Sequence, residues 1–221
     1  MTPSAERTIS DMKAVIFDLD GVICHTDEYH YQAWKAMADS MSIPFDRENN
    51  NRLRGVSRMA SLDIILENYT GELSQTEKEE LAEQKNEMYK ESLKNMSPAD
   101  LAEEVKQTLD TLRSRGLKLA IGSSSKNARF ILQQLGLGNY FDAISDGNNI
   151  THSKPDPEVF VKAAKMLCIP CEECLVVEDA VSGAIAGKAG GMKVVCVGDA
   201  SKEKAGDFNL ESFGQLLEVT A

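Results

Sequence analysis

The residues of this chain that are best suited to chemistry lie in four short polar clusters. They are Asp18 and Asp20, the stretch 123–127, Lys154, and the pair Glu178 and Asp179. Carboxylates gathered in one place need a counter-cation, and an all-oxygen ligand set suits Mg²⁺. Once that charge is offset, a carboxylate can attack phosphorus while a lysine, hydroxyls and backbone N–H groups hold the other phosphoryl oxygens. Together the clusters indicate phosphoryl transfer.

Each cluster by itself has a simpler explanation. An Asp-x-Asp pair such as Asp18 and Asp20 is more often a turn or a solvated pair than a catalytic one. Ser123 and Lys126 also match the Ser-x-x-Lys spacing of serine acyl-transfer enzymes, but no Ser-Asp-Asn or Lys-Thr-Gly follows. The sequence contains neither Gly-x-Gly-x-x-Gly nor a Walker-type loop. Only a fold that brings the clusters together would make them one site.

The polar clusters follow, or lie close to, short apolar runs that are typical of buried strands. The runs are residues 14–17, 117–121, 143–144, 175–177 and 194–197. Between them apolar residues recur at helical spacing, and two of these patterns stop at Gly116 and Gly136. The alternation predicts an α/β fold with a Rossmann-like parallel sheet covered on both faces. Ligands of such sheets bind beyond the carboxyl ends of the strands, where the clusters lie.

The segment 28–96 interrupts this alternation because it offers no strand run. Helical patterns cover residues 29–41, 57–68 and 76–93, and Thr76 with Glu79 has the spacing of a capping box. We therefore predict a small all-helical cap domain over 28–96, inserted after the first strand. The catalytic α/β core domain would comprise residues 1–27 and 97–221.

The composition of the chain limits the kinds of partner and the cellular compartment that we expect for it. Of 221 residues, 24 are basic and 35 acidic, so the net charge is −11, which argues against nucleic acid as the main partner. No apolar run is long enough for a membrane span, and the first twelve residues lack the apolar core of a secretory signal. The odd number of cysteines, 5, fits reduced thiols better than disulfides. We expect a cytoplasmic monomer that acts on a small molecule, with no nucleic-acid or membrane partner.

Three cysteines permit a different hypothesis. Cys168, Cys171 and Cys174 are spaced like the first three ligands of a bacterial iron–sulfur run, but the fourth ligand is absent and Pro170 interrupts the triplet. The alternative is that Cys168 ends an apolar helix and Cys174 opens a strand, each as a small buried residue.

Taken in order and spacing, the clusters resemble the four motifs of the haloacid dehalogenase superfamily. The matching residues are Phe17-Asp18-Leu19-Asp20-Gly21-Val22, Ser123, Lys154-Pro155 and Glu178-Asp179. Further stretches resemble the β-phosphoglucomutase family within it: His30, Ala33-Trp34-Lys35, Leu53-Arg54-Gly55-Val56-Ser57-Arg58, Lys85-Asn86, Ser97-Pro98-Ala99-Asp100, Ser125-Lys126-Asn127 and Tyr140-Phe141-Asp142-Ala143-Ile144.

The resemblance implies catalytic and metal-binding roles. Asp18 would be the nucleophile that carries an aspartyl phosphate, and Asp20 the general acid and base. Thr26 and His30 would lie at the hinge of the cap and steer Asp20. The residues implied to hold Mg²⁺ are Asp18, Asp20 through its backbone carbonyl, Glu178 and Asp179.

The resemblance also implies two phosphate sites and a sugar pocket. Ser123, Ser124 and Lys154 would hold the transferring phosphoryl group. The second phosphate would be held by Arg58, Ser125 and Asn127, with Lys126 beside them. Trp34, Arg54 with the adjoining Gly55, and Lys85 would line the cap side of the pocket. Ser124 stands where the family commonly has Ala, and Arg54 where it commonly has Lys.

These roles describe an Mg²⁺-dependent interconversion of β-D-glucose 1-phosphate and glucose 6-phosphate through glucose 1,6-bisphosphate. The alternative is a sugar-phosphate phosphatase of the same superfamily. A third hypothesis, a non-catalytic or cysteine-ligated metal protein, would leave the second aspartate, Asp20, without a use.

Overall fold

A six-stranded parallel sheet forms the centre of the larger domain in this computed structural model, which describes residues 11–53 and 56–220. The strands are β1 (Ala14–Phe17), β2 (Lys118–Gly122), β3 (Ala143–Ser145), β4 (Cys174–Glu178), β5 (Lys193–Cys196) and β6 (Phe208–Asn209). They lie in the order β3-β2-β1-β4-β5-β6, and each neighbouring pair is parallel. The predicted Rossmann-like α/β class is confirmed, and β1 lies between β2 and β4.

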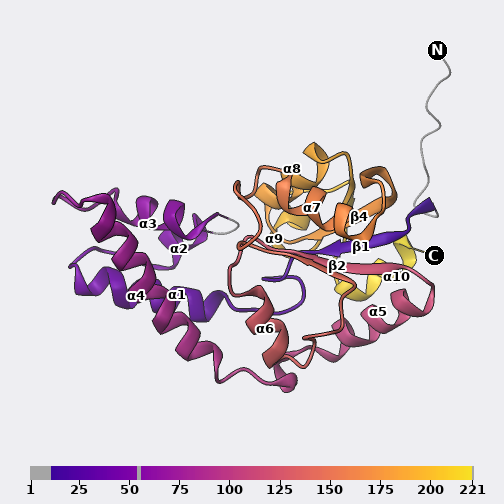
Figure 1. Ribbon diagram of the computed structural model, residues 1–221, viewed down its shortest axis with the longest axis horizontal. Helices are drawn as coiled ribbons and strands as arrows, with labels where there is room; N and C mark the ends of the chain where they lie inside the picture. Colours follow the sequence, from indigo (N-terminus) through magenta and orange to yellow (C-terminus); the bar gives the residue numbers. More distant parts are fainter. Residues whose placement is uncertain (1–10, 54–55, 221) are drawn as a thin grey trace, which may run out of the picture.

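Helices cover both faces of the sheet because alternate strand residues point to opposite sides (Figure 1). Val15 and Phe17 of β1 pack in one apolar cluster with α5 (Glu103–Ser114), α6 (Ala128–Gln134) and α10 (Leu216–Val219). Ala14 and Ile16 pack in the other with α7 (Glu158–Leu167), α8 (Val181–Ala189) and α9 (Gly198–Lys202). Burial on both faces explains why these strands read as continuous apolar runs.

Between β1 and β2 the chain forms a separate group of helices, at the left of Figure 1. They are α1 (Asp27–Ser40), α2 (Arg47–Asn51), α3 (Arg58–Leu66) and α4 (Gln75–Leu93). Their own apolar core includes Trp34 and Met37 of α1, Leu62 and Ile65 of α3, and Ala82 of α4. The helical cap after the first strand is therefore present, while the residue boundaries at 28 and 96 remain a prediction. Within the described residues, no helix is both long and apolar enough to cross a membrane.

Local details differ from the sequence expectations. The capping box of α4 is formed by Ser74 and Glu77, not by Thr76 and Glu79, because the helix begins at Gln75. Helix α2 and strand β6 were not predicted. A helix of 5 residues and a strand of 2 are too short to show a periodic apolar pattern. Single-turn 3₁₀ helices cover Pro98–Asp100, Cys171–Glu173 and Phe213–Gln215.

Candidate active site

The sheet order brings three of the polar clusters to one edge. Asp18 directly follows β1, Ser123 follows β2, and Glu178 ends β4, so their backbones leave adjacent parallel strands in the same direction. From β1 the chain continues to β2 and β3 on one side of the sheet and then returns to β4, β5 and β6 on the other side. The strand order therefore reverses at β1, and α/β sheets bind ligands at such a switch point.

Lys154 reaches this edge from the loop before α7. Its Nζ donates to Asp18 Oδ1 at 2.5 Å and to Glu178 Oε1 at 2.5 Å, and the Lys154 side chain is 2% exposed. Carboxylate oxygens of Asp18, Glu178 and Asp179 all lie within 4.8 Å of one another. The convergence that the sequence required is therefore present in the fold.

The cluster carries more negative charge than its one lysine can offset. Burial raises the pKa of Asp18 to about 7, with Glu178 adding to the shift and Lys154 opposing it. Burial alone would lower the pKa of Lys154, but Asp18 and Glu178 outweigh it and raise that pKa above its usual range. Three carboxylates on one buried cation form an all-oxygen, net-negative donor set, so the residues present fit Mg²⁺.

Two glycines leave room for the carboxylates. Gly21 has φ +79°, and a Cβ there would overlap the Asp179 carboxylate. A Cβ on Gly183, in the first turn of α8, would overlap the Glu178 carboxylate. Glu178 Oε2 is further fixed because it accepts hydrogen bonds from the backbone N–H groups of Asp179 at 2.9 Å and Ala180 at 3.0 Å.

Asp20 is held by residues at the start of the cap. Its Oδ1 accepts hydrogen bonds from the backbone N–H of Thr26 at 3.0 Å and from the Thr26 hydroxyl, and His30 Nε2 lies 3.6 Å from Oδ2. Burial would raise the pKa of Asp20, but the His30 and Thr26 hydrogen bonds lower it below its ordinary value. In this arrangement Asp20 is a carboxylate, the form that accepts a proton.

The cap supports Thr26 and His30 from α4. The Tyr89 hydroxyl donates to Thr26 Oγ1 at 3.1 Å, and the Tyr89 ring stacks on His30 with centroids 4.0 Å apart. Lys85 Nζ lies 2.9 Å from His30 Nδ1 and 4.5 Å from the centre of the Trp34 ring. Burial and the charge of Arg58 lower the pKa of Lys85 to about 7, and burial with the charge of Lys85 lowers that of His30.

A serine-rich turn before α6 faces this group from the core. Ser123 Oγ accepts from the backbone N–H of Ser125 at 3.2 Å, and Ser125 Oγ accepts from that of Asn127 at 3.2 Å. Ser124 Oγ is buried and has no hydrogen-bond partner among the described residues. A buried hydroxyl without a partner is costly, so this one is available to a ligand.

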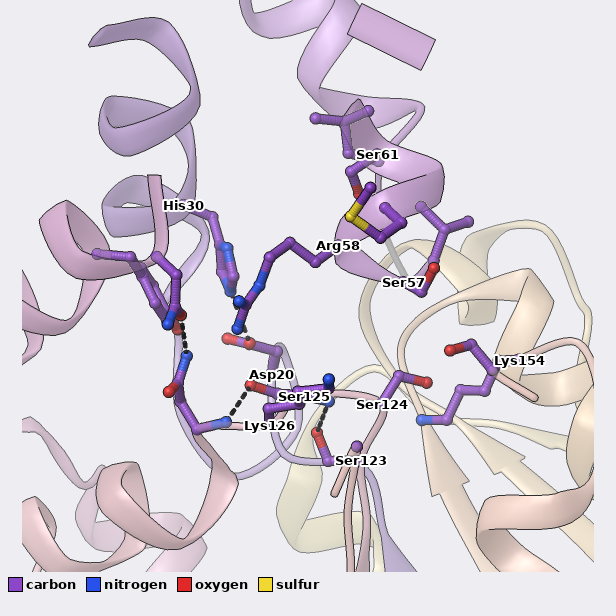
Figure 2. A pocket seen from close by; sticks show the side chains of 18 of the residues that line it. Asp20, His30, Ser57, Arg58, Ser61, Ser123, Ser124, Ser125, Lys126 and Lys154 are labelled. Carbon is purple, nitrogen blue, oxygen red and sulfur yellow. Dashed lines mark hydrogen bonds and ion pairs between the residues drawn. The ribbon is translucent and has the colours of Figure 1, made fainter. Parts of the chain in front are cut away.

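One cavity of about 540 Å³ joins core and cap. Figure 2 shows Arg58 extending into it from α3, Ser123–Lys126 along the opposite wall, and Lys154 to one side. The predicted site residues that line it are Asp18, Asp20, His30, Trp34, Arg58, Lys85, Ser123, Ser124, Ser125, Lys126, Asn127, Lys154, Glu178 and Asp179. Thr26 does not line the cavity but hydrogen-bonds to Asp20, which does, while Arg54 and Gly55 lie outside the described residues.

The cavity residues that the sequence reasoning gave no role include three polar ones on α4: Tyr89, Asn86 and Glu83. Tyr89 follows Lys85 by four positions, so helical spacing on α4 was a usable signal that it shares the Lys85 face. The contacts of Asn86 with Asn127 and of Glu83 with Arg58 cross between elements and left no local signal.

The cysteine hypothesis finds no support among residues 11–53 and 56–220, where the groups of candidate metal ligands contain no cysteine. Cys174 is buried at the start of β4, as the structural alternative predicted. Cys168 ends α7 but is exposed, so the expectation that it is buried was wrong. It takes a left-handed conformation at the helix end, with φ 57°.

Comparison with known proteins finds relatives of this chain both by sequence and by structure. The family model of haloacid dehalogenase-like hydrolases matches residues 12–191. The chain is 44% identical over 189 residues to the β-phosphoglucomutase of Bacillus subtilis (strain 168), covering 85% of this chain and 84% of that protein. It is 31% identical over 185 residues to the phosphorylated carbohydrates phosphatase of Thermotoga maritima, covering 82% and 83%. The crystal structure of β-phosphoglucomutase from Clostridium difficile matches with a TM-score of 0.88 at 35% identity, covering 95% of this chain and 97% of that one.

Proposed function

The chain belongs to the haloacid dehalogenase-like hydrolase family, and from this premise we propose that it is a β-phosphoglucomutase. It would interconvert β-D-glucose 1-phosphate and glucose 6-phosphate. The observation that carries the proposal is that one cavity contains two groups suited to phosphate. Asp18, Ser123 and Lys154 form one; Arg58, Ser125, Lys126 and Asn127 form the other.

Two phosphate sites suit a mutase because its intermediate has two phosphates. Glucose 1,6-bisphosphate must present either end to Asp18, and the other end then needs positive and hydrogen-bonding partners. A phosphatase needs partners for a single phosphate. The similarity to the Bacillus subtilis β-phosphoglucomutase, at 44% identity, supports the same assignment.

In the proposed reaction, Asp18 begins as an aspartyl phosphate. Asp20 removes the proton from the 6-hydroxyl of β-glucose 1-phosphate, whose oxygen takes the phosphoryl group from Asp18 and gives the bisphosphate. After the bisphosphate turns, a carboxylate oxygen of Asp18 attacks the phosphorus at C1. Asp20 returns its proton to the leaving oxygen, and glucose 6-phosphate leaves with the aspartyl phosphate restored.

The remaining groups hold the phosphoryl group and exclude water. Lys154 and the hydroxyls of Ser123 and Ser124 are suited to the transferring oxygens. Asp18, Glu178 and Asp179, whose carboxylate oxygens lie together, would hold Mg²⁺. The family resemblance adds the backbone carbonyl of Asp20 to this set. When bound, Mg²⁺ supplies the charge neutralisation that allows an anionic carboxylate to approach an anionic phosphate. Closure of the cap would protect the aspartyl phosphate from hydrolysis.

A sugar-phosphate phosphatase is the second candidate, favoured by the 31% identity to the Thermotoga maritima phosphatase over a similar share of the chain. A single assay separates the two. The protein is given β-glucose 1-phosphate, Mg²⁺ and a trace of glucose 1,6-bisphosphate, and glucose 6-phosphate and free phosphate are measured separately. We expect glucose 6-phosphate to dominate, whereas free phosphate as the main product would refute the mutase.

The nucleophile is tested in the same assay. Asp18→Asn keeps the size of the side chain but removes the attacking carboxylate, so it should abolish turnover while circular dichroism shows an intact fold. Near-normal activity of this variant would show that the nucleophile is assigned wrongly.

A further inference from the structure

Glu83 on α4 faces the group that we assign to the second phosphate. Its Oε2 accepts a hydrogen bond from Arg58 Nη1 at 2.9 Å, and its Oε1 accepts one from Asn86 Nδ2 at 3.1 Å. Asn86 Oδ1 in turn accepts from Asn127 Nδ2 at 2.9 Å, across the boundary between cap and core. One carboxylate is therefore joined, directly or through one amide, to two of the assigned phosphate ligands.

The arrangement places a negative charge where the second phosphate would bind. Both Glu83 and Arg58 line the cavity, and their side chains are 58% and 24% exposed. The Asn86 hydrogen bond and the Arg58 charge lower the pKa of Glu83, so it is ionised at neutral pH. A phosphate that binds Arg58 and Asn127 must displace Glu83 from Arg58 and Asn86 from Asn127. The negative charge of Glu83 then remains close to the phosphate.

We propose that Glu83 competes with the second phosphate of the substrate for Arg58 directly, and for Asn127 through Asn86, and so weakens the binding of the bisphosphate. The inference rests on the proposed function. Its physical reason is that the bisphosphate must let go of this group and turn before the second transfer. A carboxylate that takes over Arg58 as the phosphate leaves lowers the cost of that release.

The competition should act only on ligands that have a phosphate at this end of the cavity. Acetyl phosphate has a single phosphoryl group, which must face Asp18 to react, so Glu83 should not affect it. Because the ion pair is partly exposed, its effect should be modest and should decrease with added salt.

The test compares Glu83→Gln with a matched control on the same helix. Gln keeps an oxygen for Asn86 but removes the charge beside Arg58. Glu91→Gln removes an equal charge two turns further along α4, where Glu91 pairs with Lys94 at 2.5 Å and does not line the cavity. Both are made in an Asp18→Asn background for calorimetric binding of glucose 1,6-bisphosphate, and with Asp18 intact for kinetics.

We expect E83Q to tighten bisphosphate binding about two- to fivefold at low salt, the range of an exposed ion pair. High salt should reduce the difference, and E91Q should match the parent. In kinetics E83Q should lower both kcat and KM for the mutase reaction and leave kcat/KM for acetyl phosphate unchanged. Equal bisphosphate affinity in the parent, E83Q and E91Q would overturn the inference.

If the proposed function is wrong, the assays should give a different set of results. The parent protein would then release free phosphate as its main product, or would not bind the bisphosphate saturably, before any Glu83 variant is considered. That outcome would refute the mutase and this inference together, whereas a functioning mutase with indifferent E83Q refutes only the role of Glu83.

Discussion

Replacing Gly183 with Ala should damage the acidic cluster although it improves the helix. Gly183 lies in the first turn of α8, and Ala in place of Gly stabilises a helix by about 1 kcal/mol. The new Cβ, however, would overlap the carboxylate of Glu178, which is 1% exposed and cannot move into solvent. Glu178 would have to leave its partners.

The loss can be estimated from those partners. Glu178 accepts from Lys154 at 2.5 Å and from the backbone N–H groups of Asp179 and Ala180 at 2.9 and 3.0 Å. Hydrogen bonds to charged groups contribute about 1.5–3 kcal/mol each. If two of the three are broken, the cost is about 3–6 kcal/mol, and subtracting the helix gain leaves a net destabilisation of about 2–5 kcal/mol.

Urea unfolding with and without Mg²⁺ measures both consequences. Without Mg²⁺ the Gly183→Ala variant should lose about 2–5 kcal/mol of unfolding free energy. Mg²⁺ should stabilise the variant less than the parent, because a displaced ligand weakens Mg²⁺ affinity and a tenfold weaker affinity removes about 1.4 kcal/mol of ligand stabilisation. The matched control is Gly190→Ala at the end of the same helix, where the new Cβ meets its nearest atoms at 3.4 Å, an ordinary contact.

We expect the control to stay within about 1 kcal/mol of the parent in both conditions. A Gly183→Ala variant as stable as the control, with an undiminished response to Mg²⁺, would refute the placement of Glu178 against this turn.

Three further predictions follow from the same contacts. Lys154→Gln should lower kcat at least a hundredfold with the fold retained. Without Mg²⁺ this variant should unfold at a lower urea concentration than the parent, because Asp18 and Glu178 lose their buried cation. An unchanged kcat would contradict the role of Lys154. Tyr89→Phe removes the hydroxyl that donates to Thr26 at 3.1 Å, so kcat/KM should fall about two- to tenfold, the contribution of one neutral hydrogen bond. A lower thermal stability with unchanged kcat/KM would show that the hydroxyl is purely structural. Because the pKa of Asp18 is raised from 3.8 to about 7, the folded state binds more protons than the unfolded state between these values, so metal-free stability should fall as pH rises through this range. Mg²⁺ needs the ionised carboxylate, so calorimetric Mg²⁺ affinity should rise about tenfold per pH unit up to about pH 7 and then level off, and a flat profile from pH 5 to 8 would contradict the raised pKa.

The sequence was most informative where the structure depends on local pattern. The strand at 14–17 was predicted at its observed bounds, and the other predicted runs lie within one residue of β2, β3, β4 and β5, because strands buried on both faces are apolar at nearly every inner position. The polar residues that end these runs could be read as candidates since parallel strands share their carboxyl ends. The helical insertion was visible from the lack of any strand run between residues 28 and 96.

Elements and contacts without a local pattern were not predictable in this way. Strand β6 depends on pairing of Phe208 with Val195 of β5, and α4 begins at the cap formed by Ser74 although Thr76 offered the same spacing. Propensity and spacing allowed both starts, and only the structure shows that Ser74 and Glu77 form the capping box.

By itself, then, the sequence determined which residues could take part in phosphoryl transfer and on which elements they would stand. Tertiary structure alone decided that β1 lies between β2 and β4, that Lys154 reaches both Asp18 and Glu178, and that Glu83 meets Arg58. The physical reason is the separation along the sequence over which each signal acts. Apolar periodicity reports burial of neighbouring residues along one element, whereas a charge pair between residues 24 to 136 positions apart exists only once the elements have packed.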